Sequence, residues 1–158
     1  MSVQPTVSLN QFAMTTVRGV LDFRGAPQAG TVLGVQISPN QVTPLYAGDA
    51  VKLDSAAPAG GLPQVIAAAD SDVAWGFLAY SSKASTFNAG DRATAGINGA
   101  VMWGLAESTI NPGSPVESTS DGALQTKSAN PTRGTALDAG TADALFRFII
   151  ANPNSPLT

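Results

Sequence analysis

Glycine and proline recur every few residues along the whole chain, and this spacing limits the folds that the chain can adopt. The 158 residues include 16 Gly and 11 Pro, which together exceed the roughly 12% share of an average protein. They are spread along the chain rather than gathered in one linker, so few segments could form a helix of several turns. Punctuation of this kind favours short strands joined by tight turns.

Between these breaks, short apolar runs carry the pattern of β-strands. Val51 and Leu53 alternate with Lys52 and Asp54, and a period of two is typical of a half-buried strand. The run at 73–80 is apolar and aromatic, so we expect it to be buried on both faces. The strand-like segments lie at residues 31–37, 49–54, 64–68, 73–80, 91–106, 114–119, 123–127, 134–140 and 144–151.

Two of these segments predict hairpins. Asn98-Gly99 lies in the middle of the segment 91–106, and this pair favours a type I′ turn, in which both central residues need a positive φ. The tripeptide Ser-Asp-Gly at 120–122 separates the runs on either side of it in the same way. We therefore expect an antiparallel pair of strands at each place.

The tripeptide Ala-Gly-Asp occurs twice, at 47–49 and 89–91, each time directly before a strand-like run. Glycine supplies conformational freedom for a turn, and the Asp carboxylate can accept hydrogen bonds from nearby backbone N–H groups. The segment 111–116, Asn-Pro-Gly-Ser-Pro-Val, is a degenerate third version. We interpret all three as turns that begin a strand rather than as functional loops.

These patterns predict an all-β fold, a compact β-barrel or jelly-roll-like sandwich of about eight short strands with an extended N-terminal arm. Residues 1–40 show no sustained period, so we expect them to form the arm, which can include a first strand. Residues 41–158 are expected to form the barrel or sandwich domain. A chain of this length can bury a core of its own.

The charge pattern argues against nucleic-acid and membrane partners. Only 12% of the residues are charged, the net charge is −3, and the eight Lys and Arg form no basic cluster that could displace counterions from phosphates. The first residues lack the basic and apolar regions of a secretory signal. The apolar run at 144–151 is too short to span a bilayer and contains Arg147. A surface so poor in charge favours packing against other protein.

Few residues could carry out chemistry. The chain has no His and no Cys, so the usual base at neutral pH and the N and S ligands of zinc are missing. Lys83 lies among serines, where we expect a solvated loop. Asp70 and Asp72 could offer oxygens to Ca²⁺, but the Gly and distal Glu of a calcium loop are missing, which favours a polar turn. We interpret Trp75 and Trp103 as core residues, and we expect no catalytic, cofactor-binding or metal-binding residue and no enzyme.

From Tyr46 to the C-terminus, the sequence resembles the small capsid cement, or decoration, proteins of tailed bacteriophages. The resemblance is carried by the succession of AGDAVKLD, AADSDVAWGFLAY, FNAGDRATAGINGAVMWGLAES, INPGSPVESTSDGAL and GTALDAGTADALFRFIIA. The first 40 residues take no part in it.

The resemblance implies an architectural role without a cofactor. A cement protein binds the outer surface of the phage head and stabilises contacts between subunits of the major capsid protein, as a homotrimer or a dimer. The N-terminal arm then becomes a candidate for binding the coat, and it offers apolar anchors and two arginines: Phe12, Val17, Arg18, Leu21, Phe23 and Arg24.

Three alternatives stay open at this point. The arm could instead pack on its own domain. The chain could be a ligand- or carbohydrate-binding β-barrel module of a virion, such as a receptor-binding or fibre head, which would need an exposed aromatic platform. A hydrolase with a pair of carboxylates is the third class.

Overall fold

The computed structural model describes residues 18–22, 31–57, 60–81 and 84–151, and this part of the chain is all-β, as the sequence predicts. It contains no helix that could cross a membrane. Its twelve strands are β1 (Val32–Ile37), β2 (Leu45–Tyr46), β3 (Ala50–Leu53), β4 (Gln64–Ala67), β5 (Gly76–Leu78), β6 (Thr86–Phe87), β7 (Arg92–Gly96), β8 (Val101–Leu105), β9 (Pro115–Ser118), β10 (Leu124–Thr126), β11 (Gly134–Ala136) and β12 (Leu145–Ile150).

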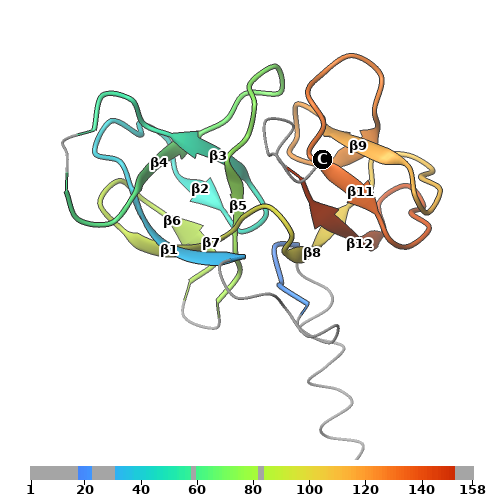
Figure 1. The fold of residues 1–158 in the computed structure, drawn as a ribbon, viewed down its shortest axis with the longest axis horizontal. Helices are drawn as coiled ribbons and strands as arrows, with labels where there is room; N and C mark the ends of the chain where they lie inside the picture. The colour runs from blue at the N-terminus through green and yellow to red at the C-terminus, as the bar shows by residue number, and fades with distance from the viewer. Residues whose placement is uncertain (1–17, 23–30, 58–59, 82–83, 152–158) are drawn as a thin grey trace, which may run out of the picture.

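The first seven strands build the N-terminal barrel, on the left in Figure 1. The closed barrel has the order β1-β4-β3-β5-β7, and β2 and β6 form a separate two-stranded ribbon. β1 pairs antiparallel with β7 and parallel with β4. The barrel therefore includes a strand from the first 40 residues, where the sequence allowed for one.

The last five strands build the C-terminal sheet, on the right in Figure 1, in the order β10-β9-β11-β12-β8. Its two edges meet at one point, because Ala106, just after β8, forms a parallel bridge with Leu124 of β10. The N–H of Glu107 also donates to the carbonyl of Leu124 at 2.8 Å. The sheet thus curls towards a barrel of its own.

The two halves repeat one strand topology. In each half, the first strand pairs with the last strand, β1 with β7 and β8 with β12. The order of the middle strands also agrees. β3 lies between β4 and β5 in the first half, and β9 lies between β10 and β11 in the second half. β5 pairs with β7 as β11 pairs with β12. The parallel contact of β1 with β4 corresponds to the bridge between residues 106 and 124.

Backbone hydrogen bonds fix this equivalence residue by residue. Gly48 donates to the carbonyl of Leu78 at 2.7 Å, and Gly113 donates to that of Ala136 at 2.8 Å. The bridge between Ile110 and Gly140 stands where the ribbon of β2 and β6 stands in the first half. The chain therefore contains two copies of one β-structure, although their sequences show no regular repeat.

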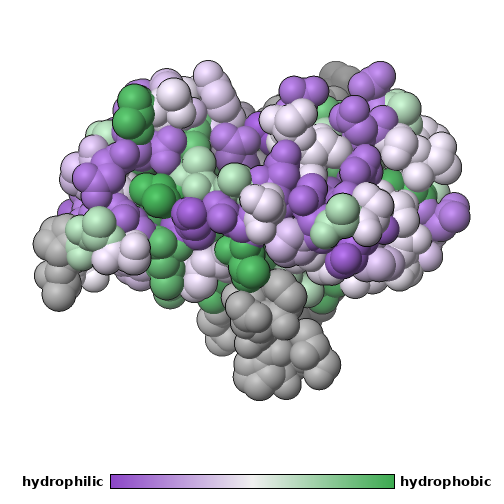
Figure 2. All heavy atoms as spheres, turned by 90° about the horizontal axis from the view of Figure 1, so that it is seen from above, coloured by the Kyte–Doolittle hydropathy of each residue, from purple (hydrophilic) through white to green (hydrophobic). Residues whose placement is uncertain are grey.

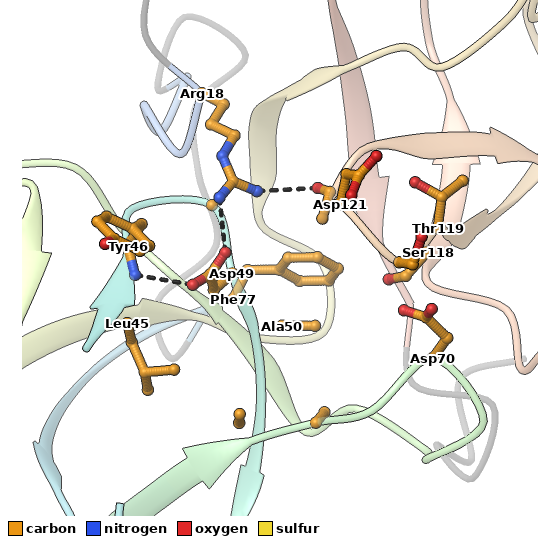
Figure 3. A pocket seen from close by; sticks show the side chains of 15 residues that line it. Arg18, Leu45, Tyr46, Asp49, Ala50, Asp70, Phe77, Ser118, Thr119 and Asp121 are labelled. Carbon is orange, nitrogen blue, oxygen red and sulfur yellow. Dashed lines mark hydrogen bonds and ion pairs between the residues drawn. The ribbon is translucent and has the colours of Figure 1, made fainter. Parts of the chain in front are cut away.

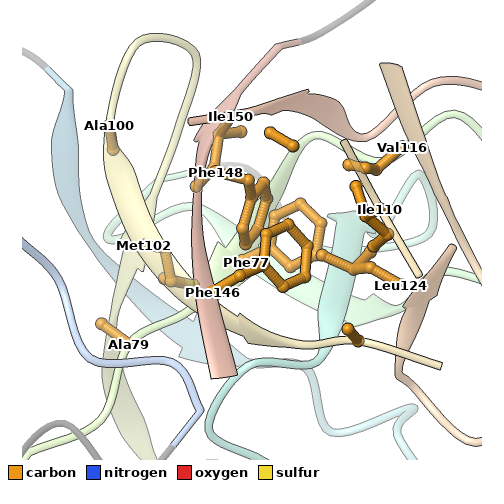
Figure 4. Close-up of a cluster of buried hydrophobic side chains, with 12 residues drawn as sticks. Phe77, Ala79, Ala100, Met102, Ile110, Val116, Leu124, Phe146, Phe148 and Ile150 are labelled. Carbon is orange, nitrogen blue, oxygen red and sulfur yellow. The ribbon is translucent and has the colours of Figure 1, made fainter. Parts of the chain in front are cut away.

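A shared core joins the two halves. One cluster of buried side chains lies within the N-terminal barrel, around Val35, Val51 and Leu78. The other cluster, drawn in Figure 4, combines Phe77 of β5 with side chains of the C-terminal sheet. Phe77 meets Phe148 edge to face, with 5.2 Å between the ring centroids. Burial of this apolar surface holds the halves together as one body.

The Ala-Gly-Asp turns have the predicted structure. Gly48 and Gly90 have φ angles of 90° and 86°, which a residue with a side chain rarely adopts. The carboxylate of Asp49 accepts the N–H of Tyr46 at 2.7 Å, and that of Asp91 accepts the N–H of residue 88 at the same distance. Gly113 has the same positive φ in the third, degenerate version. A hydrogen bond closes each turn, to the Asp carboxylate in the first two and between backbone groups in the third. A strand follows each turn.

One predicted hairpin is correct and one is wrong. β9 and β10 form the antiparallel pair expected around the Ser-Asp-Gly turn. β7 and β8 do not pair with each other, because β7 lies in the barrel and β8 in the C-terminal sheet. A turn does form at Asn98-Gly99, where Ala100 donates to the carbonyl of Ile97 at 2.9 Å. Only Gly99 has a positive φ, so the turn is not type I′ and the strands diverge.

Candidate functional site

Residues 18–22, hereafter the strap, lie at the junction of the two halves, beside β8 in Figure 1. Leu21 forms an antiparallel bridge with Met102 of β8. Gly19 and Asp22 donate to backbone carbonyls of β8, each at 2.8 Å, and Trp103 donates to the carbonyl of Val20 at 2.9 Å. The strap therefore adds a short strand to the free edge of the C-terminal sheet.

The strap also holds the N-terminal barrel. Tyr80 donates its N–H to the carbonyl of Gly19 at 2.8 Å. A Cβ at Gly19, whose φ is 86°, would lie 2.5 Å from the backbone nitrogen of Gly48, so no larger residue fits there. Arg18 forms an ion pair with Asp49 at 2.6 Å and donates to the carbonyl of Gly122 at 2.8 Å. This one side chain bridges both halves.

At its other end, the strap is fixed by Arg147 of β12. Asp22, whose side chain is only 5% exposed, forms an ion pair with Arg147 at 3.1 Å. Arg147 also donates twice to the carboxylate of Asp138, and its guanidinium lies 6.0 Å from the ring of Trp103. The hydrogen bonds that Arg147 donates to the two carboxylates, first Asp138 and then Asp22, raise its pKa above its ordinary value.

A cavity of about 270 Å³ lies next to the strap, between the two halves. Figure 3 shows Arg18 and Asp49 on one side and Ser118, Thr119 and Asp121 on the other, with Phe77 between them. Its wall combines carboxylates and hydroxyls with an apolar floor. Such a wall can accept hydrogen bonds, but it holds no base or nucleophile activated by a neighbour.

A second arginine joins the halves from within. Arg133 is 1% exposed and lies directly before β11. It donates to Ser118 at 2.7 Å, and across the junction to the carbonyls of Asp72 at 2.6 Å and Ala69 at 2.8 Å. Burial lowers the pKa of Arg133, and the charges of Asp70 and Asp72 oppose this effect. Its equivalent in the first half is Trp75. The backbone N–H of Trp75 donates to the carbonyl of Val51 in β3, and that of Arg133 donates to the carbonyl of Val116 in β9.

Glu117 organises the loop between β10 and β11. Its side chain is 1% exposed, and its carboxylate accepts the N–H groups of Ser128, Ala129 and Asn130 at 3.0, 3.0 and 2.7 Å. Burial alone would raise the pKa of Glu117, but these bonds and the amide of Gln125 outweigh it and lower the pKa to about 2. The ionised carboxylate thus replaces regular structure as the partner of the loop backbone.

The low pKa of Glu117 predicts acid sensitivity. Because the folded pKa is about 2 and the ordinary value is 4.5, this group stabilises the fold fully above pH 4.5 and progressively less down to pH 2. Glu117→Gln should lower the unfolding free energy at pH 7 by about 3 kcal/mol and flatten its dependence on pH in this range. Urea unfolding between pH 7 and 2.5 measures both effects. Glu107→Gln, at the exposed second glutamate, is the control, and an equal pH dependence in both variants would contradict the assignment.

Several of the described carboxylates accept hydrogen bonds from nearby side chains and backbone N–H groups. No group of three or more potential metal ligands occurs among the described residues. The pKa of Asp72 is lowered, first by a hydrogen bond from Lys52 and then by the N–H of Ala69. Ser38 and Asn40 lower the pKa of Asp54 in the same way. Asp72 therefore closes a polar turn, as the sequence suggested, and Lys83 lies outside the described residues.

The surface offers no single large apolar patch in the view of Figure 2, where apolar residues form separate spots between polar ones. The exposed large apolar residues lie mostly on the N-terminal half: Leu33, Val42, Tyr46, Leu53, Leu62, Val73 and Leu137. Trp75 and Trp103 are half-buried, so the prediction that they lie in the core is only partly met. Trp75 packs against the barrel cluster.

The structure places two of the six predicted partner-binding residues. Arg18 and Leu21 belong to the strap, where Arg18 bonds within the chain and Leu21 packs against the shared core. The other four, Phe12, Val17, Phe23 and Arg24, lie outside the described residues. Binding of the coat by these side chains stays a prediction. The sequence pattern did not single out Arg133 or Glu117.

Comparisons with known proteins give one kind of match. The sequence matches no known family model and no curated protein. Among solved structures, the chain is similar to one described as the crystal structure of head fiber gp8.5 N base in bacteriophage phi29. The two share 14% sequence identity with a TM-score of 0.51, over 76% of this chain and 92% of that one. At this identity, the likeness establishes that the two chains share a fold.

Proposed function

We propose that the chain is a structural protein of a phage virion, and that it acts as a cement protein on the outer surface of the head. The observation that carries this proposal is the fold, which the chain shares over most of its length with the base of a phage head fiber. The resemblance from Tyr46 onwards to capsid cement proteins supports the same location independently.

The structure suits a role that consists of holding other proteins. The two halves share one core and are joined by hydrogen bonds of Arg18 and Arg133. A cement protein buries surface against several subunits of the major capsid protein. It raises the free energy needed to separate them, because each contact after the first forms intramolecularly. We propose a homotrimer as the bound form, with a dimer as the alternative.

A second candidate is a ligand- or carbohydrate-binding module in a fibre. The described neighbour favours it, because that protein is the base of a head fiber. The two roles differ in what happens to the head. A cement protein raises the temperature at which heads break, whereas a fibre component binds the head without changing its stability.

Co-sedimentation with phage heads that lack this protein tests the proposal. We expect saturable binding of the folded protein, no binding of heat-unfolded protein, and heads that break at a higher temperature when saturated. Binding without stabilisation would support the fibre role instead. Protein that stays in the supernatant at every concentration would contradict both.

Shortening the chain tests the proposed arm. Deleting residues 2–17 keeps the strap, so the unfolding free energy should stay within about 0.5 kcal/mol of the full chain, while binding to heads is lost. Deleting residues 2–22 also removes the bonds of Arg18 and Asp22, and we expect a lower melting temperature. If the first deletion binds heads as well as the full chain does, the arm is not the anchor.

A further inference from the structure

The internal repeat exposes a difference between the two halves. The strap covers β8, and the residues of β1 equivalent to Val101, Met102 and Trp103 are Val32, Leu33 and Gly34, as the pairings of β1 with β7 and of β8 with β12 show. In the part of the chain that the structure describes, no strap covers this edge of β1.

At the start of β1, the backbone groups that point away from β7 have no partner among the described residues. Ile97 donates to the carbonyl of Thr31, and Ile37 donates to that of Asp91, both at 2.8 Å. The odd-numbered residues of β1 therefore face β7, and the even-numbered ones face away from it, because orientation alternates along an antiparallel pair. Gln36 uses its outward N–H for Pro63 at 2.9 Å. Within the described residues, the outward groups of Val32 and Gly34 meet no partner.

The same positions in the second half show what fits. There, Val101 and Trp103 use their outward groups for three hydrogen bonds with the strap, and Leu21 of the strap lies against Met102. Met102 is 0% exposed, whereas its equivalent Leu33 is 37% exposed. Leu62, which is 38% exposed, lies beside Gly34. A free strand edge flanked by exposed leucines is suited to the addition of a strand.

We propose that the edge of β1 at Val32–Gly34 binds an extended segment of a partner protein, which adds to the barrel as an antiparallel strand and places a large apolar side chain over Leu33. This inference rests on the proposed function for the identity of the partner, a subunit of the phage head. The geometry of the site depends only on the internal repeat.

Two substitutions at one position isolate the backbone contact. Gly34→Pro removes the outward N–H and leaves the bonds to β7 intact, because residue 34 does not face β7. Gly34→Ala keeps the N–H, and its Cβ would meet only Leu62 at 3.8 Å. If the proline variant fails to fold, Leu33→Ser with Leu137→Ser as the control at a similarly exposed leucine replaces it.

The first experiment uses a synthetic peptide with the sequence of residues 15–24, TTVRGVLDFR, as the probe. Amide exchange followed by NMR should slow about tenfold or more at residues 32 and 34 when the peptide is added to the wild type and to Gly34→Ala. In Gly34→Pro, which has no amide at residue 34, exchange at Val32 should stay unchanged. No slowing at these two amides would overturn the proposal. Slowing that depends on protein concentration without peptide would assign the edge to a second copy and overturn it as well.

The second experiment repeats co-sedimentation with heads. Gly34→Pro should lose at least about tenfold in affinity while Gly34→Ala binds as the wild type does. Equal binding by both variants would overturn the inference and leave the proposed function intact. If even the wild type fails to bind heads, the proposed function fails, and the peptide experiment still decides whether the edge accepts a strand.

Discussion

Replacing Gly134 by alanine should lower the unfolding free energy by more than about 3 kcal/mol, enough to leave much of the protein unfolded. A Cβ at this position would lie 2.0 Å from the carbonyl oxygen of Ile149 in the paired strand β12. Because the clashing atoms of Ile149 belong to the backbone, no side-chain rotation can relieve the clash, and the two strands must separate. Urea unfolding followed by circular dichroism measures the change.

The internal repeat supplies a second site and a control for this prediction. Gly76 occupies the equivalent position in the first half, where a Cβ would lie 2.6 Å from the carbonyl oxygen of Gly96, so Gly76→Ala should also destabilise strongly. In Gly34→Ala, the nearest atom to the new Cβ would be in the side chain of Leu62, at 3.8 Å. This variant should change the unfolding free energy by about 0.5 kcal/mol or less. A small effect at Gly134 would mean that β11 and β12 lie further apart than described.

Replacing Arg133 by methionine should lower the unfolding free energy by about 3 kcal/mol. The guanidinium is buried, and its loss leaves the hydroxyl of Ser118 and the carbonyls of Ala69 and Asp72 without their donors. Arg133→Lys should not restore stability. The planar guanidinium of arginine donates to acceptors on both sides of the junction, and the compact ammonium of lysine cannot reach them all. The measurement is again urea unfolding at neutral pH.

Arg92→Met is the matched control for Arg133, because Arg92 is exposed on β7. We expect its unfolding free energy to stay within about 0.5 kcal/mol of the wild type. If Arg133→Met is equally mild, the junction depends on the shared apolar core around Phe77 and Phe148 rather than on the arginine.

The strands that the sequence predicts well are those whose local pattern matches their surroundings. In β3, Val51 is buried and Lys52 is more exposed, as the alternation indicated, but Leu53 is exposed. β5 is buried throughout, as its apolar run indicated, although Val73 at the start of that run is exposed. β2 and β6 have two residues each, too few to produce a period, so the sequence pattern predicted neither of them. The wrong hairpin has another cause, since a turn signal does not determine which sheet each flanking strand joins.

The repeat and the junction could not be predicted from the sequence because they depend on backbone geometry. Asp143 stands where Gly90 stands in the first half, with a φ of 62°, so the same turn is formed by different residues. Arg133 and Trp75 are equivalent in the backbone but differ in chemistry.

The most direct test of the proposed function is electron cryomicroscopy of phage particles prepared with this protein. The proposed function predicts density for the two joined β-structures on the outside of the head, in contact with more than one subunit of the major capsid protein. The proposed strand addition also predicts a strand from a neighbouring subunit beside β1. Particles whose head surface lacks this density, whether the protein lies elsewhere in the particle or is absent from it, would contradict the proposed function.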